Sequence, residues 1–134
     1  MSRRSQLWFL LLVIVQTMHS VEEHSTELYL NLAPARYVSG LISGDPELGF
    51  IIFNALIVAF GFWCYFVPVR AGYAAARALA WGWVIVELAN GVAHIALAAN
   101  AGGYFSGAAT APLLIIAAAG LAMSLRNDKY SPSM

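Results

Sequence analysis

The chain has 134 residues, of which 60% are hydrophobic and only 10% are charged, and its mean hydropathy is +0.71. Soluble domains carry a much larger charged fraction, so this composition indicates an integral membrane protein. Seven basic residues balance seven acidic ones, and a net charge of zero argues against a nucleic-acid partner.

Four apolar segments are predicted to form helices that cross a membrane. Each can reach across the hydrocarbon core of a bilayer, which needs about 20 helical residues. Glycine and proline residues separate the segments, and short connections are typical of antiparallel neighbours. The predicted helices cover residues 6–29, 48–67, 73–99 and 108–125. We therefore expect residues 1–134 to form one all-α domain, an antiparallel four-helix bundle in the membrane.

The first segment also has the outline of a secretory signal peptide, because two arginines precede an apolar run over residues 7–15. Around His19, however, the chain lacks the small-x-small pattern of a good cleavage site. We therefore expect the segment to be retained as a helix. Cleavage at this point would remove His19, which belongs to the first of two polar clusters.

The first polar cluster ends this segment. Glu22 and Glu23 follow His19 by three and four residues, so all three side chains project from one face of a helix. By the same spacing, His24 points away from that face. The structural alternative is a helix that simply leaves the membrane into headgroups and water.

The connection from residue 30 to residue 47 is longer than a helix bundle needs. Pro34 favours the start of a short helix over residues 35–42, lying along the outer surface. Such a helix can act as a lid or can anchor the bundle in the headgroups.

The second polar cluster lies in the third segment. Glu87 is near the middle of the apolar stretch 74–99, and His94 follows it by seven residues on the same helical face. Ionisable side chains at membrane depth are costly and mark proton, ion, substrate or metal sites. A buried pair that only fixes helix register is the structural alternative. Asn54 and Asn90 are expected to support the site as interhelical hydrogen-bond partners.

Both clusters are predicted to lie at one depth. At about 1.5 Å per residue, His19 and Glu23 lie about 20–25 Å from the cytoplasmic start of the first helix. On the same scale, Glu87 lies at about 14 Å and His94 at about 24 Å in the third helix. Asn54 descends from the outer end of the second helix to a similar level. We therefore expect a polar layer in the outer half of the bilayer.

The basic residues predict the orientation, because all but one fall on the same side of this topology. An excess of lysine and arginine marks the cytoplasmic side, so both termini should be cytoplasmic. All four tryptophans fall toward the same side. The residues on this side are Arg3, Arg4, Arg70, Arg77, Arg126 and Lys129, with Arg36 on the other.

Two imidazoles and three carboxylates on facing helices suit a divalent metal such as zinc, iron or manganese. The expected ligands are His19, Glu22, Glu23, Glu87 and His94. Their order differs from the Glu-x-x-His pattern of two-metal bundles, being reversed in the first helix and absent in the third. A single zinc or iron ion and a two-metal centre therefore both stay open. Glu23 and Glu87 are the expected catalytic groups.

A metal-free site is the second interpretation of the same residues. A desolvated glutamate beside a histidine can shuttle protons. The chain would then be an acid–base isomerase or a proton-coupled carrier of small solutes.

Three short motifs occur in a characteristic order: His-x-x-Glu-Glu over residues 19–23, a second histidine at His94, and Tyr104-x-Ser106-Gly107. Together they resemble the HXXEE domain family, whose last motif is Tyr-x-Pro-Gly. Ser106 stands where that family has proline, so the backbone of this turn is less rigid. Tyr104 either caps the site from the outer side or anchors the chain at the membrane interface.

The resemblance implies a small multi-pass protein of the bacterial inner membrane with no established activity. The residues themselves favour a metal-binding intramembrane enzyme that acts on a lipid-like or small apolar substrate. The alternatives are a proton-coupled transporter, a metal-free isomerase and a structural membrane protein with a buried polar network.

Overall fold

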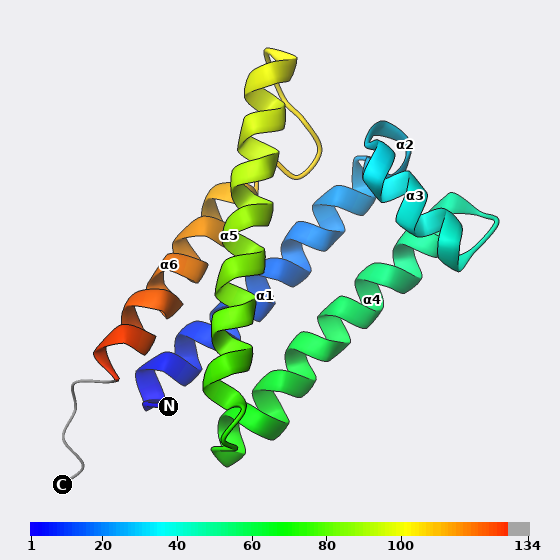
Figure 1. Ribbon diagram of the computed structural model, residues 1–134. Helices are drawn as coiled ribbons and strands as arrows, with labels where there is room; N and C mark the ends of the chain where they lie inside the picture. The colour runs from blue at the N-terminus through cyan, green and yellow to red at the C-terminus, as the bar shows by residue number, and fades with distance from the viewer. Residues whose placement is uncertain (129–134) are drawn as a thin grey trace, which may run out of the picture.

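The computed structural model describes residues 1–128, and this part of the chain is all-helical, as predicted (Figure 1). Lys129, one of the residues used to predict the orientation, lies outside the described residues. The elements are α1 Arg3–Ser25, α2 Leu28–Asn31, α3 Ala33–Ile42, α4 Pro46–Cys64, the π-helical η1 Tyr65–Val69, α5 Ala76–Ala101 and α6 Ala111–Asn127.

Helix α1 is central, with α4 packed on one side of it and α6 on the other, while α5 packs on α6 (Figure 1). The core between α1 and α6 contains fully buried side chains such as Phe9, Leu12 and Leu121. The ring of Trp8 lies against Gly120, where an added Cβ would come within 2.5 Å of it. Helices α4 and α5 meet near η1 and diverge toward their other ends (Figure 1).

The helix bounds differ from the predicted ones by two or three residues at most ends, and two differences have a clear physical cause. The first helix ends at Ser25 and not at residue 29, because Glu27 adopts a left-handed backbone conformation with φ of 56° before the short α2 begins. The second helix does not stop before Pro68 but continues as the π-helix η1. Proline has no backbone N–H to donate, and a wider helical turn accommodates its ring.

The predicted surface helix after the first segment is present as α3. It packs closely on α4, because the position of a Cβ on Gly49 lies only 2.1 Å from the carbonyl oxygen of Ser39. The Asp45 side chain caps α4 by accepting hydrogen bonds from the backbone N–H groups of Glu47 and Leu48. Helix α3 is therefore held over one end of α4.

Two helical stretches in residues 1–128 are long and apolar enough to cross a bilayer. They are Pro46–Val69, with 24 residues and a mean hydropathy of 2.2, and Ala76–Ala101, with 26 residues and a mean hydropathy of 1.5. Helix α6 is apolar but has 17 residues. The four-span topology stays a prediction.

Candidate metal centre

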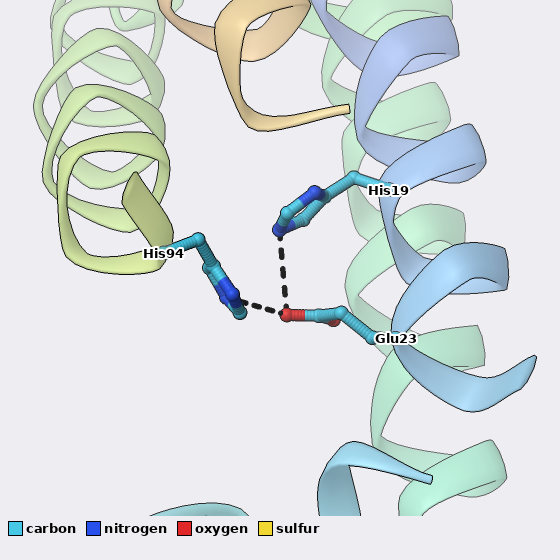
Figure 2. Close-up of side chains that lie close together, drawn as sticks. All are labelled: His19, Glu23 and His94. Atoms are coloured by element: carbon cyan, nitrogen blue, oxygen red, sulfur yellow. Dashed lines mark ion pairs between the residues drawn. The ribbon is translucent and has the colours of Figure 1, made fainter. Parts of the chain in front are cut away.

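Three of the five expected ligands come together in a buried cluster, the trio of His19, Glu23 and His94 (Figure 2). His19 and Glu23 lie one turn apart on α1, and His94 faces them from α5. Glu23 Oε1 is 2.9 Å from His94 Nε2 and 3.4 Å from His19 Nε2. The three side chains are 0%, 7% and 3% exposed in the order of their numbers. Their potential ligand atoms all lie within 4.8 Å of one another.

The connection between α5 and α6 fixes the ring of His94. Its Nδ1 lies 2.5 Å from the backbone carbonyl oxygen of Ser106. A carbonyl only accepts hydrogen bonds, so Nδ1 must carry the hydrogen. In the neutral imidazole, Nε2 then presents a lone pair toward Glu23.

The start of α6 fixes the ring of His19 in the same way. Its Nδ1 lies 2.7 Å from Thr110 Oγ1, and the Thr110 hydroxyl lies 2.5 Å from Glu22 Oε2. Because a carboxylate accepts, the hydroxyl hydrogen goes to Glu22, and Thr110 Oγ1 accepts from His19 Nδ1. The Nε2 lone pair of His19 therefore also points toward the centre of the trio.

When both imidazoles are neutral, three acceptor atoms therefore converge, whereas protonation of His94 Nε2 turns its 2.9 Å approach to Glu23 Oε1 into a hydrogen bond. His19 Nε2 is buried and has no hydrogen-bond partner, although Glu23 Oε1 is nearby. Such a grouping is repulsive unless a proton or a metal ion lies between the atoms. A histidine that donates its other ring N–H to a carbonyl or another polar group is in the state in which histidine binds metals.

Gly107 closes the cluster and explains the last position of the Tyr-x-x-Gly segment. Its φ of 84° is in the left-handed region that favours glycine. A Cβ at this position would lie 2.5 Å from His94 Nδ1 and 2.9 Å from His19 Cε1. Only glycine lets the chain pass so close to both imidazoles.

Glu22 does not face the trio. The Tyr104 hydroxyl donates to its Oε1 at 2.6 Å, and the backbone N–H groups of Ala109 and Thr110 donate to its two oxygens at 3.0 and 2.8 Å. These N–H groups lie at the start of α6, where helices leave donors unpaired and favour negative charge. Glu22 therefore caps α6 and holds Thr110 in place for His19.

Glu87 also lies outside the trio. Its side chain is 1% exposed, and its Oε2 is buried without a hydrogen-bond partner. Glu87, Asn90 and Asn54 line a cavity of about 830 Å³ between α1, α3, α4 and α5, which we call the lateral cavity. Asn54 donates to the carbonyl oxygen of Phe50 at 3.1 Å, so its hydrogen bond lies within α4 and is not interhelical as predicted. Glu23 lines the same cavity, so the trio borders it.

Sequence reasoning missed Thr110, Gln16 and the carbonyl role of Ser106. Thr110 precedes Ala111 and Pro112, a helix-start pattern that identifies an N-terminus but not its partner. Gln16 is 4% exposed and lines the lateral cavity, and it is one of the few polar residues in the first apolar run. A backbone carbonyl leaves no sequence signal.

No family model, no curated protein and no solved structure matches the chain. The resemblance of its motifs to the HXXEE domain family therefore stays a prediction, and the function has to be argued from the geometry of the trio and the lateral cavity.

Proposed function

We propose that His19, Glu23 and His94 bind one divalent transition metal, and that the protein is a multi-pass membrane enzyme acting on a lipid-like or small apolar substrate. The observation that carries this proposal is the convergence of two Nε2 atoms and one carboxylate oxygen, with both Nδ1 atoms hydrogen-bonded to acceptors outside the trio. Two histidines and one carboxylate suit zinc in hydrolases and iron(II) in oxygenases.

The geometry favours one metal ion over two. Glu22 is engaged by the start of α6, and Glu87 lies two turns before His94, about 10 Å along α5. Neither carboxylate completes a second ligand set beside the trio. A bound metal would supply a Lewis acid at the wall of the lateral cavity.

Residues of the chain itself would orient the ligands and exchange protons. The Thr110 hydroxyl and the Ser106 carbonyl, which accept from the Nδ1 atoms of His19 and His94, orient the two rings, and Glu23 joins the trio to the lateral cavity. Glu87 is placed to exchange a proton with a molecule in this cavity, because its unpartnered Oε2 belongs to a residue that lines it. In the proposed topology, with cytoplasmic termini, these groups lie in the outer half of a bacterial inner membrane.

The metal proposal is tested by elemental analysis of the detergent-purified protein. The wild type should contain close to one zinc or iron per chain, and His19→Ala and His94→Ala should each lose it. His24→Ala is the matched control, because His24 lies outside the trio and pairs with Glu47 at 3.8 Å. Helix content by circular dichroism shows that each variant is folded. Absence of bound metal in folded wild type after incubation with zinc and with iron would overturn the proposal.

A metal-free proton carrier is the second candidate, and the 2.9 Å approach of Glu23 Oε1 to His94 Nε2 favours it. A proton held between these atoms would replace the metal as the group that relieves their repulsion. This function requires proton-linked solute flux into liposomes that is lost in Glu87→Gln. Unchanged flux in Glu87→Gln would exclude the role of that carboxyl.

A further inference from the structure

The lateral cavity is long and lies between the two helices best suited to cross the membrane. Its α5 wall runs from Ala78 to Asn90, about 18 Å along the axis, and its α4 wall runs from Phe50 to Phe60, about 15 Å. Its volume of about 830 Å³ is within the usual range for small-molecule sites. An extended chain therefore matches this shape better than a compact solute.

The cavity has a mouth between α4 and α5. These helices touch near η1, where the rings of Phe60 and Trp83 stack with centroids 6.2 Å apart, and they diverge away from η1 (Figure 1). Phe53 and Phe60 on α4 and Val86 on α5 line the cavity and are also exposed on the surface of the molecule. In a membrane-spanning protein such a mouth faces the acyl chains of the bilayer, so a ligand enters sideways.

Two residues that line this cavity each carry a buried polar atom without a partner. The amide group of Gln16 donates to the Ser20 hydroxyl at 3.2 Å and leaves Oε1 without a donor, and Oε2 of Glu87 is likewise unpaired. Both residues line the cavity from opposite sides, on α1 and on α5. Burying an acceptor without a partner costs free energy, so the cavity favours a ligand that carries a hydrogen-bond donor.

The charges of the lining residues restrict the headgroup. The polar lining residues are Gln16, Glu23, Asn54, Glu87 and Asn90. In the described part of the chain this lining includes two carboxyl groups and no arginine or lysine. A phosphate or a carboxylate would meet like charges without a cation. A hydroxyl has one hydrogen, so it pairs with both residues by donating to Gln16 Oε1 and accepting from Glu87 in its protonated form.

We infer that the lateral cavity binds a single-chain aliphatic alcohol, which enters from the bilayer between α4 and α5 and places its hydroxyl between Gln16 and Glu87. This inference names the substrate class of the proposed metal enzyme and rests on that function only for turnover, not for binding. The hydroxyl of the ligand would lie on the wall of the cavity that also includes Glu23. The aliphatic chain of the ligand would extend from there away from the trio, toward η1.

The test uses a hexadecanol probe with a diazirine at mid-chain, photocrosslinked to the protein in lipid nanodiscs and mapped by peptide mass spectrometry. We expect the label on cavity-lining residues of α4 and α5. Unlabelled hexadecanol should compete about tenfold better than methyl palmitate or palmitate, since those lack a hydroxyl donor. Equal competition by all three, or better competition by a two-chain phospholipid, would overturn the inference.

Matched variants locate the binding site. Gly82 lines the cavity and has nothing within 4 Å of an added Cβ, so Gly82→Trp should fill the cavity and abolish labelling. Gly40 on α3 is equally unobstructed and lies outside the lining, so Gly40→Trp should label normally. Gln16→Leu should remove the preference for the alcohol. Unchanged labelling of Gly82→Trp would overturn the site.

Two further results separate this inference from the metal proposal. His94→Ala removes a metal ligand but no lining residue, so it should lose metal and keep alcohol labelling. Wild type that holds metal but shows no alcohol preference would overturn the substrate class alone. Concentration-dependent chain-to-chain crosslinks that block labelling would instead show that a second copy covers the mouth and would also overturn it.

Discussion

The α1–α6 interface and the space between α4 and α5 are built in opposite ways. Between α1 and α6, buried leucines interlock, the Trp8 ring lies against Gly120, and buried Ser5 and Ser124 hydroxyls pair at 2.8 Å. Between α4 and α5 the walls diverge and Glu87 keeps an unpaired oxygen. Close packing with paired polar groups makes α1 and α6 a stable frame. Incomplete packing with unpaired polar groups leaves room for a ligand between α4 and α5. The trio lies where this frame meets the cavity.

The largest effect is expected from Gly107→Ala, which forces a Cβ against both imidazoles of the trio. Metal affinity should fall by at least about tenfold, as it does when groups that orient ligands are disturbed. Gly102→Ala is the matched control, because Gly102 also has a positive φ of 68° but has nothing within 4 Å of an added Cβ.

The control variant should lose only about 1–2 kcal/mol of stability, the cost of a left-handed alanine, and should keep its metal. Metal titration and thermal unfolding of both variants measure the two effects. Equal metal affinities in the two variants would contradict the role given to Gly107.

Glu22→Gln is expected to have the next largest effect, although Glu22 is not in the trio. The substitution removes the negative charge that caps α6 and disturbs Thr110, which accepts from His19. Metal affinity should fall about tenfold and stability by about 1 kcal/mol. Metal titration separates these outcomes, and Glu27→Gln on the exposed turn provides a charge-matched control. Unaltered metal binding with reduced stability would make Glu22 a helix cap alone.

A glycine-to-alanine substitution should change the stability in opposite directions in the two regions. Gly120→Ala pushes a Cβ into the Trp8 ring and should destabilise the protein by about 1–3 kcal/mol. Gly82→Ala meets no atom and should stabilise it by about 0.5–1 kcal/mol, because alanine favours a helix more than glycine does. Denaturation in detergent measures both. Destabilisation by Gly82→Ala would show that the region near α4 is more tightly packed than the structure indicates.

Much of the fold could be predicted because apolar length and turn residues are local properties of the sequence. The helix over residues 35–42 and the all-α class follow from such signals. The end of the first helix could not be predicted, since the left-handed conformation of Glu27 has no glycine or proline to announce it. The π-helix around Pro68 depends on how α4 approaches its neighbours, which proline alone does not indicate.

The sequence predicted the level of the candidate site along the helices, but it only partly predicted which way the side chains point. Helical spacing correctly brought His19, Glu23 and His94 to one level. It could not separate Glu22 from Glu23, since the partner of Glu22 is the start of α6, which a tertiary contact places there. Glu87 shares a helical face with His94, but two turns of helix keep it from the same metal ion.

The smallest effect is expected where the start of α1 meets the end of α6. Asp128 accepts hydrogen bonds from the Ser2 backbone N–H at 3.0 Å and the Ser5 hydroxyl at 2.8 Å. Partial burial opposes ionisation, but these hydrogen bonds and the N-terminal ammonium group outweigh it and lower the pKa of Asp128 below the usual 3.8. A carboxyl with a lowered folded pKa stabilises the protein above its unfolded pKa, and this contribution is lost as the pH falls through the folded value. Below about pH 4 the wild type should therefore lose stability that Asp128→Asn does not lose, while metal binding at neutral pH stays the same in both. Unfolding measured across this pH range tests this prediction, and parallel curves for the two proteins would show that the contact between the start of α1 and the end of α6 adds nothing to the stability.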